Sequence, residues 1–153
     1  MSQARTTREH ATADASGRTF DADLNFLVRW ASPLTPVARA MLAYIFILEG
    51  AEKIGSYSSV VGYMQAHGVD GRLLPLVILT ELGGGLLVLV GLKTRWAAIA
   101  LSGYCWLTAL IFHLGADQAI QFNKNVAMSG GFLALAILGP GLWSLDAWRA
   151  RAV

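Results

Sequence analysis

Long stretches of apolar residues are the feature that most constrains how this chain folds. Residues 96–116 and 125–145 carry no formal charge, and Glu81 is the single charged residue within residues 73–92. A helix needs about 20 residues to cross a hydrocarbon core about 30 Å thick, and lipid offers no hydrogen bonds to any other open backbone. The pattern therefore predicts an all-α membrane protein, a bundle of four transmembrane helices at about 37–54, 73–92, 96–116 and 125–145.

Composition supports this class and excludes others. Hydrophobic residues make up 55% of the chain and charged residues only 14%, against about a quarter charged in soluble domains. A net charge of +2 with no basic run argues against nucleic acid as a partner. One cysteine and three histidines leave no disulfide and no expected metal site. No nucleophile elbow is present, so the sequence contains no self-contained catalytic site.

The chain is predicted to divide into four parts. Residues 1–23 are polar and lack the apolar core of a signal peptide, which predicts a mobile cytoplasmic tail. Residues 24–35 form a short amphipathic segment expected on the membrane surface. Residues 36–146 hold the four-helix transmembrane domain, and residues 147–153 a second cytoplasmic tail.

The distribution of Lys and Arg predicts the orientation in the bilayer. If both termini are cytoplasmic, the inner side collects more of these residues than the outer side. The inner set is Arg29, Arg39, Lys93, Arg95, Arg149 and Arg151, and the outer set is Lys53, Arg72 and Lys124. In the first outer connection, residues 55–72, apolar side chains recur at helical spacing at Tyr57, Val60, Val61 and Met64. This spacing predicts a short interfacial helix.

Ionisable residues within the spans are the candidate functional residues, because each is costly in a bilayer. Glu49 and Lys53 are spaced i,i+4 and can form an ion pair along one helix face. The predicted topology brings polar groups from all four helices into the outer half of the bundle. Two interpretations stay open, a ligand-binding or proton-handling site and a structural cluster that fixes helix register. The ionisable candidates are Glu49, Lys53, Glu81, His113 and Lys124, and the neutral polar Asn125 beside Lys124 is counted with them.

Glycines and aromatic residues in the spans have simpler interpretations. Small residues allow close helix packing in membranes, which is the role expected for Gly83, Gly84, Gly85, Gly130 and Gly131. Tyr44, Tyr104 and Trp106 either line a flat aromatic pocket or only pack within the spans.

Several of these residues together resemble the DoxX family of small four-helix membrane proteins. The resemblance covers about residues 37–146. Its elements are Arg39-(x)6-Phe46-(x)3-Gly50-(x)2-Lys53, Gly68-Val69, Glu81-Leu82-Gly83-Gly84-Gly85-Leu86, Gly91-Leu92-Lys93-Thr94-Arg95, the late His113, Lys124-Asn125-(x)4-Gly130-Gly131, and Gly139-Pro140-Gly141-(x)2-Ser144-Leu145-Asp146.

The resemblance implies a role at the bacterial inner membrane. DoxX-type and DoxD-type subunits are linked to quinone oxidoreductases, so it implies an accessory subunit of a quinone-linked redox complex, with quinone as a ligand and redox proteins as partners. Glu49 and Glu52 are extra relative to the usual pattern of the family. The alternative is a non-catalytic assembly or anchor protein with a structural polar cluster. A transporter is disfavoured, because four spans without an inverted repeat leave little room for alternating access.

Overall fold

The computed structural model describes residues 2–152, with side chains at Asn25, Phe26 and from Trp30 onward. It is helical, with no strand among these residues. The chain divides into two units, Met1–Leu34 and Thr35–Val153. Helix α1 (Ser2–Gly55) contributes to both.

The first unit differs from the sequence prediction in its backbone. Residues 2–34 are helical, where a mobile tail and a separate surface segment were expected. Residues with good helix propensity are frequent here, and α1 continues through Pro33 and Pro36 without a break. The mobility and cytoplasmic location of residues 1–23 stay predictions.

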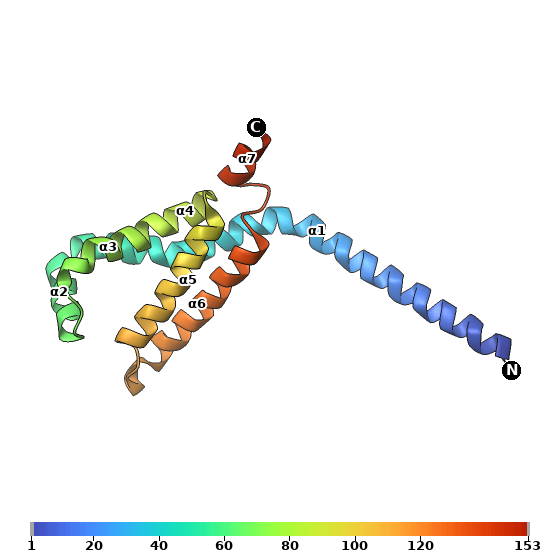
Figure 1. Cartoon of the computed structure of the whole chain (residues 1–153), viewed down its shortest axis with the longest axis horizontal. Coiled ribbons are helices and arrows are strands. Elements are labelled where there is room, and N and C mark those ends of the chain that lie inside the picture. Colours follow the sequence, from blue (N-terminus) through green and yellow to red (C-terminus); the bar gives the residue numbers. More distant parts are fainter. Residues whose placement is uncertain (1, 153) are drawn as a thin grey trace. The chain divides into compact units, whose positions relative to one another are not determined.

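The second unit contains the remaining elements (Figure 1). After α1 come α2 (Tyr57–Ala66), the short helix η1 (Gly71–Leu73), α3 (Leu74–Ile78), η2 (Leu79–Gly83) and α4 (Gly84–Val90). Then follow α5 (Thr94–Phe112), η3 (Ala116–Gln118), α6 (Ala119–Leu138) and α7 (Leu145–Arg151). Helix α2 occupies the connection at residues 55–72, where the sequence predicted a short helix.

Three described segments are long and apolar enough to cross a membrane, namely Trp30–Gly55, Gly71–Val90 and Thr94–Phe112. Helix α6 is not among them, because Gln121, Asn123, Lys124 and Asn125 fall in its first turns. It begins earlier than the predicted fourth span and ends at Leu138 rather than 145. The chain breaks there because Gly139 and Gly141 have φ of +91° and +75°, a region that favours glycine. A fourth membrane crossing therefore stays a prediction.

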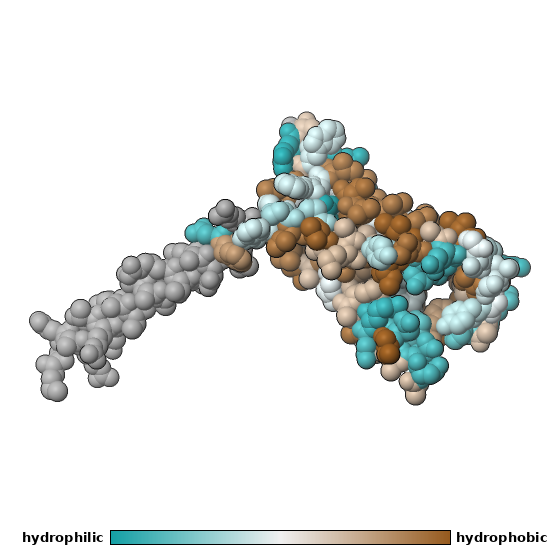
Figure 2. All heavy atoms as spheres, turned by 180° about the vertical axis from the view of Figure 1, so that it is seen from behind, coloured by the Kyte–Doolittle hydropathy of each residue, from teal (hydrophilic) through white to brown (hydrophobic). Residues whose placement is uncertain are grey.

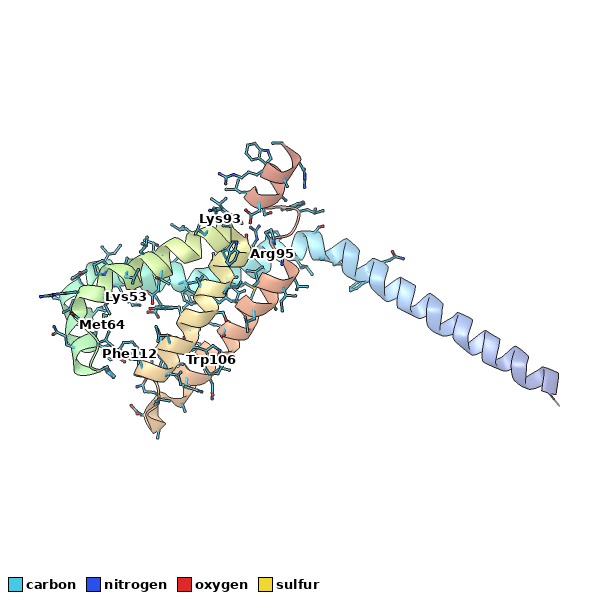
Figure 3. All side chains as sticks on the ribbon, viewed as in Figure 1. Lys53, Met64, Lys93, Arg95, Trp106 and Phe112 are labelled. Atoms are coloured by element: carbon cyan, nitrogen blue, oxygen red, sulfur yellow. The ribbon has the colours of Figure 1, made fainter. Side chains whose placement is uncertain are left out.

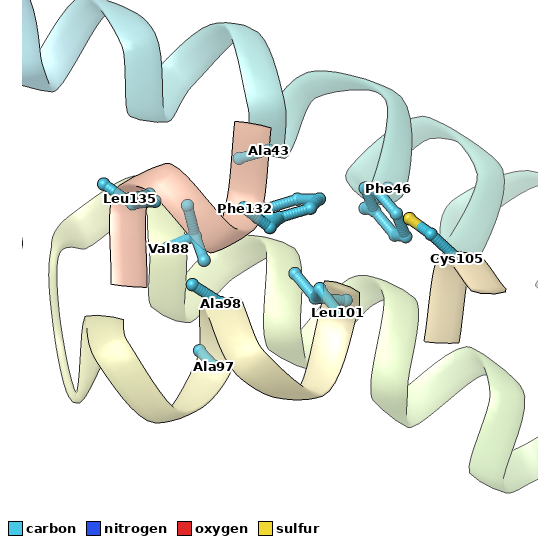
Figure 4. Close-up of a cluster of buried hydrophobic side chains, with 9 residues drawn as sticks. All are labelled: Ala43, Phe46, Val88, Ala97, Ala98, Leu101, Cys105, Phe132 and Leu135. Atoms are coloured by element: carbon cyan, nitrogen blue, oxygen red, sulfur yellow. The ribbon is translucent and has the colours of Figure 1, made fainter. Parts of the chain in front are cut away.

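The core lies where α1, α4, α5 and α6 meet (Figure 4). Phe46 of α1 packs edge-to-face on Phe132 of α6, with ring centroids 5.3 Å apart. Helices α5 and α6 pack along one another, and the hydroxyls of Ser102 and Ser129 hydrogen-bond across them at 2.8 Å. The buried cluster comprises Ala43, Phe46, Val88, Ala97, Ala98, Leu101, Cys105, Phe132 and Leu135.

The segment after α6 is fastened to the loop between α4 and α5. Backbone N–H groups of Lys93 and Thr94 donate to the Asp146 carboxylate at 2.8 and 2.9 Å, so Asp146 caps the start of α5. Arg39, only 2% exposed, donates to the Trp143 carbonyl. Arg39 was expected as a flanking charge that sets topology. Its burial shows that it also holds this end of the unit together.

Candidate functional site: a polar cavity between the helices

A cavity of about 540 Å³ opens between α1, α2, the Gly71–Val90 segment, α5 and α6. Figure 3 shows Lys53, Met64 and Phe112 around it, and Figure 2 shows a hollow with a hydrophilic rim on this side of the molecule. Most of its wall is aliphatic or aromatic. All six candidates from the sequence line it: Glu49, Lys53, Glu81, His113, Lys124 and Asn125.

Lys53 is the centre of an ion-pair cluster in this cavity. Its Nζ lies 3.1 Å from Glu49 Oε2 and 2.9 Å from Glu81 Oε2. The Glu81 side chain is 7% exposed, whereas that of Glu49 is 48% exposed. The expected i,i+4 contact of Glu49 with Lys53 is therefore present, and the partner of Glu81 among the candidates is Lys53.

Glu81 also accepts a hydrogen bond from the Tyr104 hydroxyl at 2.6 Å. The short distance is typical of an O–H donor and a charged acceptor. Of the three aromatic residues considered from the sequence, Tyr104 lines the cavity, while Tyr44 and Trp106 are 64% and 44% exposed and do not line it. A signal for Tyr104 was available, because Tyr104 and Thr108 are spaced i,i+4 and form a polar stripe on α5.

Glu81 lies in a π-helical turn, η2, in the middle of the second span. Such turns are rare and frequently occur at functional sites, because the extra residue redirects side chains and interrupts the regular backbone bonds. Opposite this turn, Gly50 of α1 approaches so closely that a Cβ on it would lie 2.9 Å from the Leu82 nitrogen. Gly50 thus allows α1 to approach the backbone that carries Glu81.

Asn125 is held on the α6 side of the cavity and is 7% exposed. Its Nδ2 donates to the Gln121 carbonyl at 3.0 Å, and its Oδ1 accepts from the Thr108 hydroxyl at 3.3 Å. These bonds engage both ends of the amide. Asn125 therefore fixes α6 against α5 at the cavity wall.

His113 and Lys124 line the cavity where α5 ends and α6 begins. His113 Nδ1 is buried and has no hydrogen-bond partner within the described residues. No carboxylate in the described part of the chain lies within ion-pair distance of Lys124. The structure thus places all six candidates on one cavity, but it does not connect His113 or Lys124 to the Lys53 cluster.

Helix α2 forms another wall of the cavity, through Val60, Tyr63 and Met64. Tyr63 stacks on Phe112 of α5 with ring centroids 5.5 Å apart, and His67 lies 5.3 Å from the same ring. Met64 is 4% exposed. The α2 helix is therefore packed against the end of α5 and closes part of the cavity.

The glycines expected to pack helices fall into two groups. A Cβ on Gly84 or Gly85 would meet Leu101 or Ile47 at 3.0 Å, and one on Gly131 would meet Leu42 at 2.9 Å. These three glycines lie in close helix contacts. Gly83 would meet only Leu79 of its own turn and Gly130 nothing within 4 Å, because neighbouring helical residues point in different directions.

Among the described residues, no group of three His, Cys, Asp or Glu side chains is arranged to hold a metal ion. The cavity instead combines apolar walls with a few placed polar groups, the usual makeup of a site for a small organic molecule. Its volume falls within the usual range of about 300–1,000 Å³ for such sites.

The fold and the cavity together define an all-α membrane protein with a buried polar cluster between its helices. The model of the DoxX family matches residues 34–114, and the chain belongs to this family. It is 47% identical over 113 residues to inner membrane protein YqjF of Escherichia coli (strain K12), covering 72% of this chain and 87% of that protein. It is 35% identical over 120 residues to inner membrane protein YphA of the same organism, covering 72% and 86%. No solved structure matches it significantly.

Proposed function

We propose that this chain is an inner-membrane accessory subunit of a quinone-linked redox complex and that its cavity binds the quinone head group. Family membership and the two inner-membrane relatives support the location. In this proposal α6 forms the fourth span, and both termini face the cytoplasm. Reporter fusions at the two ends would test this topology.

The observation that carries the proposal is the convergence of six costly polar side chains on one cavity with apolar walls. Charged side chains within spans are expensive and usually mark functional positions. A cluster that served only to lock helices together would be expected to pack without a cavity beside it. Here the Lys53–Glu81–Tyr104 group borders open space of about 540 Å³.

The residues fit a quinone head group. Aromatic and aliphatic side chains such as Phe46, Tyr63 and Met128 offer apolar surface to a planar ring. His113 Nδ1 is a buried polar atom without a partner, so it is able to hydrogen-bond a carbonyl oxygen. A bound quinone would supply two-electron chemistry coupled to protons.

The chain's own role would be to bind the ring and to handle protons. The Tyr104 hydroxyl donates to the Glu81 carboxylate at the cavity wall, so the phenol keeps its proton and the carboxylate is the group that would accept a further one. Lys53 offsets the carboxylate charge, and Glu49, which is half exposed, links the cluster to the surface. Cys105 is the only cysteine and is fully buried. The sequence offers no redox-active pair, so electrons would have to come from a partner protein.

One observation favours the rival function, a non-catalytic assembly or anchor protein. Glu81 is paired through both oxygens. Oε1 accepts the Tyr104 hydrogen bond, and Oε2 lies 2.9 Å from the Lys53 ammonium in an ion contact without an aligned hydrogen bond. A fully paired cluster of this kind can fix helix register without any ligand. The proposed function requires Glu81 for quinone binding, whereas the rival function requires it for folding.

The test is purification from native membranes in mild detergent, followed by an absorption spectrum, extraction of bound quinone and identification of partner proteins. The proposal expects quinone with the native chain and its loss from Glu81→Gln, with the helical circular dichroism spectrum retained. Lys93→Gln, which changes a charge away from the cavity (Figure 3), is the control and should retain quinone. If no quinone accompanies the native chain and Glu81→Gln unfolds, the assembly function is correct.

A further inference from the structure

The charges around the cavity are unevenly placed. Both lining carboxylates, Glu49 and Glu81, contact the ammonium group of Lys53. The other lining ammonium group, that of Lys124, has no carboxylate within ion-pair distance in the described chain. The cavity lining therefore has two carboxylates around one cation, Lys53, and a second cation, Lys124, without a carboxylate partner among the described residues.

His113, like Lys124, lies where α5 ends and α6 begins, and one nitrogen of its ring has no hydrogen-bond partner among the described residues. Helix α5 ends at Phe112, a short connection follows, and α6 begins at Ala119. The end of α5 and the start of α6 lie at the same end of this helix pair (Figure 1). His113 directly follows α5, Lys124 lies in the first turns of α6, and both line the cavity. The backbone N–H of His113 bonds to the Ala109 carbonyl, but its ring atom Nδ1 has no partner among the described residues.

The remaining polar groups nearby do not satisfy these two. Asn125 is engaged by Thr108 and by the Gln121 carbonyl. Gln118 and Gln121 line the cavity but carry no charge. An ammonium group and a buried imidazole with no protein acceptor leave a place for an acceptor supplied by a ligand.

We infer that Lys124 and His113 bind an electron-rich oxygen of the ligand and so orient it within the cavity. This inference rests on the proposed function and adds the orientation of the ligand in the cavity. The ligand's acceptor oxygen lies at the α5–α6 end, and the opposite edge of its ring faces Glu81 and Tyr104. A ligand whose oxygen carries negative charge binds more tightly than a neutral one, because the hydrogen bond from Lys124 is then charge-assisted on both sides.

The experiment is isothermal titration calorimetry on the full chain in phospholipid nanodiscs with three probes. These are naphthoquinone, its hydroxy derivative with an acidic hydroxyl that is deprotonated at neutral pH, and naphthalene, which has the ring without oxygens. The native chain should bind the anionic probe most tightly and naphthalene least. Lys124→Gln should bind the anionic probe about tenfold more weakly, which is the effect of losing one charge-assisted hydrogen bond. This variant should therefore no longer prefer the anionic probe to neutral naphthoquinone.

Two matched variants complete the design. Lys124→Arg keeps the charge and should keep the preference, while Lys93→Gln removes a positive charge elsewhere and should change nothing. A native preference that survives Lys124→Gln overturns the assignment of Lys124 while leaving the quinone proposal intact. If the native chain binds neither quinone in a saturable way, the proposed function itself fails.

Discussion

Replacing Lys53 with methionine is expected to cost more stability than any other single change in the cavity cluster. Methionine keeps the length of the side chain but removes the cation that contacts Glu81 at 2.9 Å. The Glu81 side chain is 7% exposed, so its carboxylate would stay buried with only the Tyr104 hydroxyl as partner. Removing one member of a buried ion pair costs about 3–5 kcal/mol, because the remaining charge is uncompensated.

Glu49→Gln provides the matched comparison. It removes the other carboxylate that contacts Lys53, at 3.1 Å, but that side chain is 48% exposed. Ion pairs of exposed groups contribute about 0–1 kcal/mol. Lys53→Met removes both contacts, whereas Glu49→Gln removes only the more exposed one. The difference between their costs therefore measures the buried contact with Glu81.

Unfolding by sodium dodecyl sulfate in mixed micelles, followed by circular dichroism, measures both losses. The double variant Lys53→Met/Glu81→Gln should recover much of the stability lost in Lys53→Met, because the charge that remains, on Glu49, is half exposed to solvent and no uncompensated buried charge is left. Equal losses for Lys53→Met and Glu49→Gln, or no recovery in the double variant, would refute the assignment of Lys53 and Glu81 as a buried pair.

Three further predictions concern packing and the α4–α5 loop. Gly50→Ala should cost about 1–3 kcal/mol from crowding against the Leu82 backbone, whereas Gly103→Ala, with nothing within 4 Å, should gain up to about 1 kcal/mol of helix propensity; the same unfolding assay compares them. Ser102→Ala should lose about 0.6 kcal/mol, typical of hydrogen bonds between membrane helices, and adding Ser129→Ala should lose little more. Burial acts to raise the pKa of Asp146, but the N–H groups of Thr94 and Lys93 lower that pKa below its ordinary value of 3.8. The loss of stability caused by Asp146→Asn should therefore be largest above pH 3.8 and should disappear as the pH falls through the lowered pKa of Asp146. Hydrogen exchange of the backbone amides at the start of α5 would measure this loss.

The sequence predicted the helical class and the short helix between the first two long apolar segments, and both are present, because a bilayer restricts the backbone to helices. It also identified polar residues that the structure places on one cavity, because charges are conspicuous in apolar stretches. Glu81 illustrates this, as the single charge in an apolar stretch. The function of these residues stays a prediction. The partner of Glu81 among several cations depended on helix rotation, which local sequence does not determine.

Other features depended on tertiary contacts. Helix α6 begins at Ala119, whereas the apolar stretch in the sequence predicts a span that begins at residue 125. The difference arises because the first turns of α6 are polar and line the cavity. The π-helical turn at Leu79–Gly83 has no local sequence signal. The close approach of Gly50 to Leu82 in this turn is likewise visible only in the three-dimensional structure. In the sequence, Arg39 resembles a charge that flanks a span. Its hydrogen bond to the Trp143 carbonyl is a long-range contact that local sequence does not predict.

Quinone binding in this cavity can be examined by photolabelling of the full chain in native membranes with an azidoquinone, mapped by mass spectrometry. We expect saturable labelling of cavity residues such as Tyr63, Tyr104 and Lys124, and excess unmodified quinone should prevent this labelling. Labelling confined to exposed residues outside the cavity such as Ile137, or labelling insensitive to competing quinone, would show that the cavity does not bind quinone.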